Sequence, residues 1–402
     1  MQPILTGMRI IEGSAFIAAP MCGMTLAQLG ADVIRFDQIG GGIDYRRWPV
    51  TDKNNSIYWA EMNKGKRSIA VNIRSDAGRE LLADLICAPG ANAGIFSTNL
   101  PATGMLAYEK LSLRRPDLIQ HEIVGNRHGT SALDYTVNAK VGFPFVTGRQ
   151  DDERPVNHVL PAWDIACAYH AAIDILAADR YRKMHGVGQK ITLALADVAL
   201  TSVGHLGLVG EVHINGEERG RWGNYLYGAF GRDFVTSDNE RIMLIAASIK
   251  QWKGLVEASN LQHEISKLEQ QMNLDFCREG DRFSAIEELC ALFEPWVAKL
   301  PLSELSPLLD AHGICWEKYQ TIGNLVRNDP DCSPENPIFE TIEQVGIGEY
   351  PVPDSAAYFS SVDRTAPVRA PEVGEHTDEI LSTILNLDAS TIGKLHDDGI
   401  VA

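Results

Sequence analysis

Long apolar segments are absent from this sequence. None of its 402 residues lies in a run of roughly eighteen uncharged apolar residues, the length that a membrane-spanning helix needs. The first residues, Met1–Gly7, also lack the basic and then apolar order of a secretory signal. We therefore expect no association with a membrane and a cytoplasmic location.

Ordered cysteine and histidine motifs are absent as well. The chain has seven cysteines at irregular spacings with no Cys-x-x-Cys pair, and its histidines form no His-Glu-x-x-His motif. An odd number of scattered cysteines indicates neither a disulfide framework nor a zinc site. We expect most of the cysteines to be small buried side chains and the protein to hold no metal.

Three common catalytic fingerprints are missing too. The P-loop spacing does not occur, and Ser14–Pro20 stands where a dinucleotide-binding fold would carry Gly-x-Gly-x-x-Gly. Gly40–Gly42 follows an expected strand, but its spacing fits neither motif and favours a flexible turn. No Gly-x-Ser-x-Gly is present either. These absences argue against a nucleotide hydrolase, a nicotinamide enzyme and a serine hydrolase.

Positive charge is scarce overall but concentrated in one segment. The chain has 53 acidic and 36 basic residues, and its net charge of −17 argues against a nucleic-acid partner. Residues 35–79 nevertheless hold nine basic and five acidic residues, a local balance of +4. This basic segment indicates either a site for a small polyanionic ligand, since Arg suits phosphate, or a solvated surface. Its core consists of Arg46, Arg47, Lys64, Lys66 and Arg67.

Short apolar runs alternate with helical patterns in the first half of the chain. Such alternation is typical of an α/β fold with a mostly parallel sheet and helices on both faces. One helix is expected to begin with Asp76 as its N-cap. We expect strands at 8–12, 31–36, 68–73, 93–97, 118–124 and 189–193, and helices at 20–30, 76–86 and 165–183.

A change of composition near residue 211 suggests a domain boundary. The chain there becomes rich in glycine and aromatic residues, and a smaller α+β pattern follows at 241–310. Later the chain returns to strands and proline-rich loops and ends in two short helices. Two domains also suit the length. We expect a large domain begun by residues 1–210 and completed by residues 313–402, with a linker and a small α+β domain in residues 211–312.

Asp164 is the strongest candidate for a catalytic residue. It adjoins a long helical pattern, so a role as helix N-cap is one interpretation. The same place offers free helix N–H groups and the positive end of the helix dipole, which favour an ionised carboxylate. Such a carboxylate beside the apolar Trp163 could act as a nucleophile on an activated carbonyl. The residues alone leave both interpretations open.

Several fragments, in their order and spacing, resemble the family III CoA-transferases. They are Leu5–Glu12, Ala18–Pro20, Leu29–Arg35, Asn63–Ile69, Gly186–Lys190 and Ala370–Leu381. The resemblance covers nearly the whole chain. It implies an acyl-CoA substrate and no cofactor beyond coenzyme A. It also implies a Rossmann-like large domain built from both chain ends, a small domain, and a homodimer whose subunits interlock as rings.

The resemblance also implies roles for single residues. Asp164 matches the nucleophilic Asp of the family. Six predicted CoA contacts match the family: Phe16, Ile17, Ala18, Lys66, Asn99 and Leu100. Gln38, which stands where some members carry Arg, is a seventh, and Lys64 and Arg67 from the basic segment complete the set. For the substrate, we expect the side chains of Arg46, Arg47 and Tyr135 to hold its distal carboxylate. We expect the backbone N–H groups of Gly223 and Asn224 to donate to the oxyanion.

Two departures from the family pattern bear on the reaction. Leu133 stands where racemases of the family carry a catalytic His, so racemase chemistry would lack half of its acid–base pair. Aromatic residues interrupt Gly220–Gly231, where intermolecular transferases carry a run of four glycines.

Longer stretches, Glu12–Phe16, Asn157–Asp164 and Gly223–Phe234, resemble members that move CoA between the two carboxyl groups of one branched unsaturated dicarboxylic acid. We therefore expect intramolecular transfer through an aspartyl anhydride and an aspartyl–CoA thioester. An intermolecular transferase, an acyl-CoA racemase and a non-catalytic CoA-binding protein remain alternatives.

Overall fold

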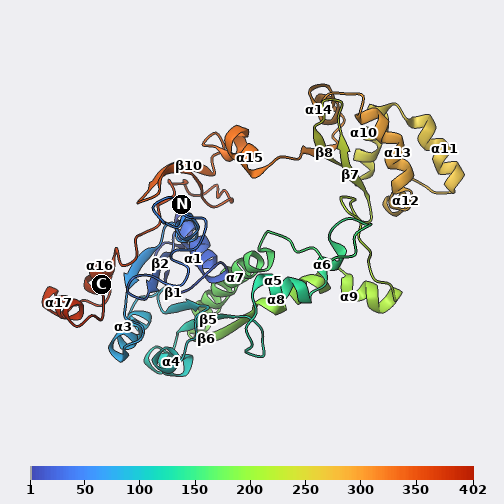
Figure 1. Cartoon of the computed structure of the whole chain (residues 1–402). Coiled ribbons are helices and arrows are strands. Elements are labelled where there is room, and N and C mark those ends of the chain that lie inside the picture. The colour runs from blue at the N-terminus through green and yellow to red at the C-terminus, as the bar shows by residue number, and fades with distance from the viewer. Residues whose placement is uncertain (1) are drawn as a thin grey trace. The chain divides into compact units, whose positions relative to one another are not determined.

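A six-stranded parallel sheet forms the centre of the larger part of the molecule, in a computed structural model that describes residues 2–402 (Figure 1). The strand order β3-β2-β1-β4-β5-β6 is that of a doubly wound, Rossmann-like fold. The expected α/β fold with a large parallel sheet is therefore confirmed. The strands are β1 (Arg9–Gly13), β2 (Asp32–Asp37), β3 (Arg67–Ala70), β4 (Ile95–Thr98), β5 (Ile119–Val124) and β6 (Gln189–Ala194).

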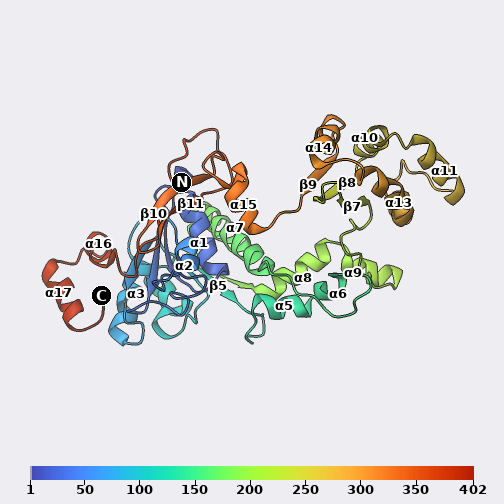
Figure 2. The same cartoon turned by 45° about the horizontal axis from the view of Figure 1, so that its top comes forward.

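Helices cover both faces of this sheet. Neighbouring side chains on a strand point to opposite faces, so Ile11 packs in one core with residues of α3, whereas Glu12 approaches Gly23 of α1. On the face of Glu12, α1 packs along α7 (Figure 2). The helices of this part are α1 (Ala18–Gln28), α2 (Ile57–Met62), α3 (Asp76–Cys87), α4 (Tyr108–Arg114), α5 (Asp134–Lys140), α7 (Ala162–His185), α8 (Leu195–His205) and α9 (Leu208–Gly210).

The C-terminal segment returns to the β3 edge of the sheet. The Thr377 hydroxyl accepts a hydrogen bond from the Ala70 N–H (3.2 Å) and donates one to the Ala402 carbonyl oxygen (2.7 Å). Ile380 and Leu381 are fully buried in the core under α3. The far end of the chain thus completes the fold that its beginning starts. The elements of this segment are β10 (Phe339–Gln344), β11 (Gly348–Pro353), α16 (Thr377–Thr383) and α17 (Ala389–Asp397).

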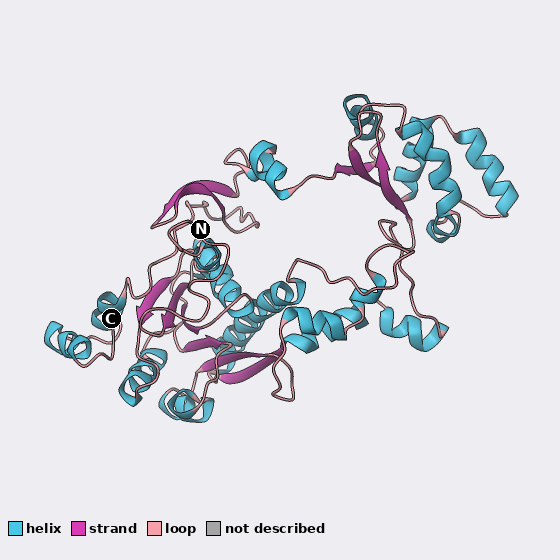
Figure 3. Cartoon of the chain, viewed as in Figure 1, coloured by secondary structure: helices cyan, strands magenta, loops and turns pink. Residues whose placement is uncertain are grey.

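A second sheet, antiparallel and three-stranded, belongs to a separate core (Figure 3). The rings of Phe230, Trp252 and Phe293 meet there with centroids 5.2–5.9 Å apart. Aromatic groups of this size bury much apolar surface and stabilise a small core. The elements are α6 (Phe143–Val146), β7 (Phe230–Val235), β8 (Arg241–Ala246), α10 (Ile249–Ser259), α11 (Gln262–Met272), α12 (Glu279–Ser284), α13 (Ile286–Val297), α14 (Leu302–Ala311), β9 (Cys315–Lys318) and α15 (Ile322–Asn328).

The chain divides into two compact units. The larger unit contains the parallel sheet and comprises residues up to Val141, Val159–Asn215 and Asp329–Ala402. The smaller unit comprises Gly142–His158 and Gly216–Asn328. The domain boundaries expected from composition, after residues 210 and 312, stay a prediction. Short 3₁₀ helices occur at Pro3–Leu5, Gly104–Leu106 and Pro330–Cys332, and a π-helical turn at Glu211–Asn215.

One expected helix cap, Asp76, is wrong, and the interpretation of Asp164 as a cap is excluded. Ser75, not Asp76, caps α3, because its hydroxyl accepts a hydrogen bond from the Gly78 N–H (3.0 Å). Asp164 does not cap α7 either: the helix begins at Ala162, and Asp164 lies inside its first turn. Strand β7 was not expected, since its sequence directly follows the glycine-rich segment.

Within residues 2–402, no single helix has both the length and the apolar composition to cross a membrane. One bent pair, Leu195–His205 with Leu208–Asn215, meets the criteria of length and composition when its two helices are taken together.

Candidate active site

Asp164 lies in the first turn of the longest described helix, α7, where its backbone N–H is bonded but its side-chain carboxylate accepts no hydrogen bond from the described residues. The N-cap of α7 is Pro161, whose side chain offers no acceptor. The Asp134 carboxylate takes that place: its Oδ2 accepts hydrogen bonds from the N–H groups of Trp163 (2.8 Å) and Asp164 (3.1 Å). Among residues 2–402, no group donates a hydrogen bond to the carboxylate of Asp164 itself.

The Asp164 side chain lines a cavity of about 240 Å³ in the larger unit. Four of the predicted CoA contacts line the same cavity, so the fold brings together residues from the β1–α1 connection, the end of β4 and the start of α7. Leu133 is also there, and none of the cavity's lining residues is a histidine. The lining is Phe16, Ile17, Ala18, Asn99, Ile123, Val124, Gly125, Ser131, Ala132, Leu133, Asp164 and Leu195.

The electrostatic surroundings make Asp164 a more basic carboxylate than usual. Burial and, to a smaller extent, the negative charge of Asp134 raise the pKa of Asp164 to about 6 against the opposing charge of Arg47. This corrects the expectation that helix N–H groups favour the anion, because Asp134 occupies those donors. At neutral pH the carboxylate is still mostly ionised, and no described residue donates a hydrogen bond to it or pairs with it, so its oxygens are available for nucleophilic attack.

The connection between β1 and α1 is held in an unusual conformation beside Asp164. Phe16 has φ +68°, a left-handed value that costs a bulky residue conformational energy. Its N–H donates to Asp44 Oδ2 (2.9 Å), while the Asn99 amide exchanges two hydrogen bonds with the Ala15 backbone (2.9 and 2.7 Å). These contacts fix the backbone that lines the cavity.

Arg47 is an exposed cation at this connection. Its guanidinium lies over the ring of Phe16 at 5.2 Å and over the ring of Tyr58 at 5.5 Å. Burial raises the pKa of Tyr58 to about 12, so its hydroxyl stays protonated at neutral pH. Two aromatic rings thus hold a planar cation within electrostatic range of Asp164, an arrangement suited to a carboxylate ligand.

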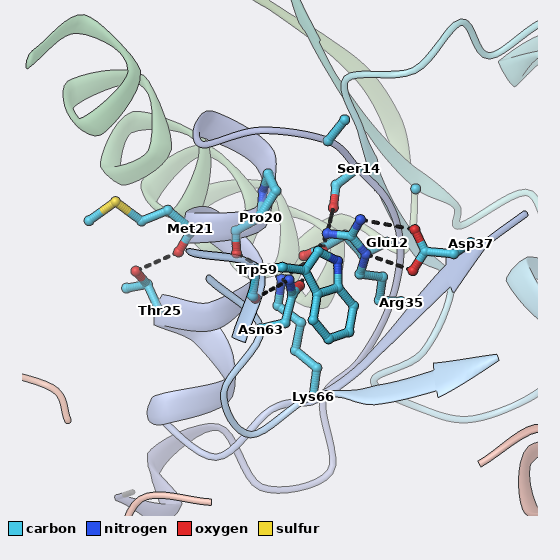
Figure 4. A network of polar contacts seen from close by, with 12 residues as sticks. Glu12, Ser14, Pro20, Met21, Thr25, Arg35, Asp37, Trp59, Asn63 and Lys66 are labelled. Carbon is cyan, nitrogen blue, oxygen red and sulfur yellow. Dashed lines mark hydrogen bonds and ion pairs between the residues drawn. The ribbon is translucent and has the colours of Figure 1, made fainter. Parts of the chain in front are cut away.

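A buried network of charges stabilises the connection between β1 and α1, and Figure 4 shows the network. Arg35 donates to Asp37 (2.8 and 2.9 Å) and to Asp44 (3.0 Å), the residue that holds Phe16. Lys66 donates to Glu12 (2.7 Å) and also to the Pro20 carbonyl and Asn63. The sequence did not identify Arg35 and Asp44 as site residues, although both lie in the basic segment, residues 35–79.

The other predicted cations are also engaged inside the protein. Lys66 is buried, and its three hydrogen bonds use the donors of an ammonium group. Lys64 pairs with Glu61 and donates to the Pro353 carbonyl oxygen, and Arg67 pairs with Asp32 and Glu379. None of the three lines the Asp164 cavity.

A second cavity of about 290 Å³ lies at the ends of β1 and β2 and contains Gln38 and Leu100. Gln38 accepts a hydrogen bond from the Ile73 N–H (3.1 Å). Arg74 also lines this cavity and was not singled out from the sequence, although the basic segment includes it. The lining is Ser14, Ala15, Phe36, Asp37, Gln38, Gly41, Gly42, Ile43, Ile73, Arg74 and Leu100.

The remaining predicted substrate contacts lie elsewhere. Arg46 lines a third cavity with Lys53 and Glu372. The Tyr135 hydroxyl donates to the Val159 carbonyl oxygen (3.3 Å) at an exposed position. Gly223 and Asn224 belong to the smaller unit. The described residues contain no cluster of three or more His, Cys, Asp or Glu side chains that could hold a metal ion.

Proteins of known name resemble this chain over nearly its full length. The chain is 52% identical over 403 aligned positions to a protein named 2-methylfumaryl-CoA isomerase from Chloroflexus aurantiacus, covering 100% of this chain and 98% of that protein. It is 25% identical to a succinyl-CoA:mesaconate CoA-transferase from Haloarcula marismortui, over 94% of this chain and 95% of that one.

The fold has relatives among solved structures. A CAIB/BAIF family protein from Brucella suis matches with a TM-score of 0.75 and 24% identity, covering 96% of this chain and 100% of that one. The family model described as CoA-transferase family III matches residues 5–377. This chain therefore belongs to the family III CoA-transferases.

Proposed function

We propose that this protein moves CoA between the C1 and C4 carboxyl groups of mesaconyl-CoA, converting 2-methylfumaryl-CoA to 3-methylfumaryl-CoA. The observation that carries the proposal is an ionisable carboxylate, Asp164, that lines a cavity and accepts no hydrogen bond from the described residues. The isomerase from Chloroflexus aurantiacus, similar over the full length, supports this choice of substrate.

In the proposed mechanism, an Asp164 oxygen attacks the C1 thioester carbonyl and forms a mixed anhydride, with CoA thiolate as the leaving group. The thiolate attacks the aspartyl carbonyl, which forms an Asp164–CoA thioester and frees the dicarboxylate. The dicarboxylate turns, and its C4 carboxylate attacks this thioester to form the second anhydride. The thiolate then attacks the C4 carbonyl and restores Asp164. Bonds formed and broken balance, and the acyl activation is conserved.

The two cavities divide the substrate between them in this proposal. The Asp164 cavity takes the acyl group, and the cavity of Gln38, Arg74 and Leu100 takes the nucleotide of CoA. Arg47, held by two rings beside Asp164, binds the carboxylate that is not esterified. We propose no role in CoA binding for Lys66, because its donors are already used.

The assembly and location form part of the same proposal. We infer a homodimer of interlocked subunits in the cytoplasm, with the larger unit as the CoA-binding domain and backbone N–H groups of Gly223 and Asn224 as oxyanion donors. A molar mass in light scattering that corresponds to a monomer at the assay concentration would contradict the interlocked dimer.

The decisive experiment follows both esters and free acid together. The purified protein is incubated with the C1 ester of mesaconyl-CoA, with and without isotopically labelled free mesaconate. The C1 and C4 esters are then separated by chromatography, and their label content is measured by mass spectrometry. Conversion to the C4 ester with little label is the expected result, since a retained acid keeps a high effective concentration.

An intermolecular CoA transferase is the second candidate, favoured by similarity to the succinyl-CoA:mesaconate CoA-transferase. It predicts extensive incorporation of labelled acid in the same assay. Racemase chemistry receives no support from the cavity, because Leu133 stands there and none of the lining residues is a histidine. Absence of both conversion and an acyl–enzyme adduct would favour a non-catalytic CoA-binding protein.

A further inference from the structure

The side chain that shapes the surroundings of Asp164 most directly is another acid, Asp134. It is 4% exposed and is the first residue of α5. Its Oδ2 atom accepts from two consecutive N–H groups, those of Trp163 and Asp164. One turn later on α5, Asn138 accepts a hydrogen bond from the Trp163 indole (3.1 Å). Helix α5 therefore fastens the first turn of α7 at two points.

The helix needs this outside partner. The first N–H groups of any helix lack partners within it, and they are normally satisfied by an N-cap side chain. Pro161 occupies the N-cap of α7 and cannot accept. Without Asp134, these N–H groups would be available to the carboxylate of Asp164, which belongs to the same first turn. A carboxylate bonded to backbone donors is a weaker base and a weaker nucleophile.

We propose that Asp134 is a positioning residue for the reaction: its charged carboxylate holds the backbone donors of α7 and so leaves the Asp164 carboxylate free, unshielded and directed to the cavity. This inference rests on the proposed function, in which Asp164 is the nucleophile. A neutral acceptor could hold the same N–H groups. The negative charge adds a second effect, because it disfavours the Asp164 anion and makes that anion more reactive.

The charges that face Asp164 come from several elements. Asp134 on α5 repels the anion, and Arg47 after β2 attracts it. Tyr58 on α2 and Cys167, one turn along α7, also interact with Asp164, and their pKa values are raised to about 12 by burial. Both therefore stay neutral at working pH. Among the described groups that interact with Asp164, Asp134 is thus the only anion, and removal of its charge should lower the pKa of Asp164.

The test separates the cap from the charge. In Asp134→Asn, the amide oxygen still accepts from the N–H groups of Trp163 and Asp164, but the charge is lost. We expect the acid limb of kcat/KM against pH to move to lower pH and the plateau to fall a few fold. In Asp134→Ala the cap is lost as well, and a displaced nucleophile should lower the plateau by about 100-fold. The matched control is Asp84→Asn on α3, which removes an exposed charge that pairs with Arg114 of α4.

Each outcome decides something. An acid limb of Asp134→Asn that coincides with those of the wild type and of Asp84→Asn overturns the proposal. If the Asn variant does not fold, as judged by circular dichroism, Asp134→Ser supplies another neutral acceptor for the same comparison. Asp164→Ala is measured beside them. Turnover by Asp164→Ala would overturn the proposed function itself, whereas its loss together with an unmoved acid limb would overturn only the role of Asp134.

Discussion

Two groups of charged side chains in the larger unit behave in opposite ways. In the network around β1 and β2, every charged side chain has a partner: Lys66 with Glu12, and Arg35 with Asp37 and Asp44. At the start of α7, none of residues 2–402 forms an ion pair with Asp164, and the charge of Asp134 opposes its ionisation. Paired charges hold the cavity wall in place, and the unpaired charge remains available to react.

The comparison predicts its largest effect on activity. Asp164→Ala removes the only proposed nucleophile, so the rate of conversion between the two esters should fall by at least about 10⁴-fold. CoA binding, measured by calorimetry, and the circular dichroism spectrum should stay near those of the wild type. Near-normal turnover by this variant would contradict the proposed mechanism.

The paired network should respond in stability rather than in chemistry. Lys66→Met leaves the buried Glu12 without its cation, and breaking such a pair costs about 3–5 kcal/mol of the free energy of unfolding. Urea denaturation measures this loss. Arg79→Met, which removes an exposed ion pair with Asp76, is the control and should cost at most about 1 kcal/mol. Equal losses in the two variants would show that the network contributes no more than a surface pair.

Arg47 connects the two groups, because it lies on Phe16 and faces Asp164. If it binds the free carboxylate of the substrate, Arg47→Ala should raise KM by about 10–100-fold, the value of a charged hydrogen bond of about 1.5–3 kcal/mol. Arg46→Ala, which removes a neighbouring exposed cation that lines a different cavity with Lys53 and Glu372, is the matched control. A similar KM in both variants would remove Arg47 from the substrate site.

The sequence predicted the parallel sheet well because the signals for it are local. β1 and β2, for example, are short apolar runs separated by one helix and a glycine turn, and the structure places them within about a residue of the expected positions. Asp164 was also identified, first as one interpretation of a helix start and then through family resemblance. It lines one cavity with Phe16 and Asn99, two residues whose contact with CoA stays a prediction.

The rest depended on which side chains meet across the fold. Lys66 and Arg67 looked like ligands for phosphate, but their partners Glu12 and Glu379 are distant in sequence. The cap of α7 comes from Asp134, 30 positions before Asp164, so the local pattern suggested the wrong capping residue. Local sequence shows that a charge exists, whereas only tertiary structure shows whether it is already paired.

The smallest expected effect is the pH-dependent cost in stability of the unpaired Asp164 carboxylate. The pKa of Asp164 is raised from its ordinary 3.8 to about 6, so its contribution favours the folded state below the unfolded pKa and is lost as pH rises through about 6. Above that pH, the ionised side chain destabilises the fold, and Asp164→Asn should relieve this cost. Because the side chain is partly exposed, we expect a gain of about 1–2 kcal/mol at about pH 8 that disappears near pH 4. Urea denaturation at the two pH values measures it. A variant that loses both activity and stability at the higher pH would instead place Asp164 among the paired, structural charges.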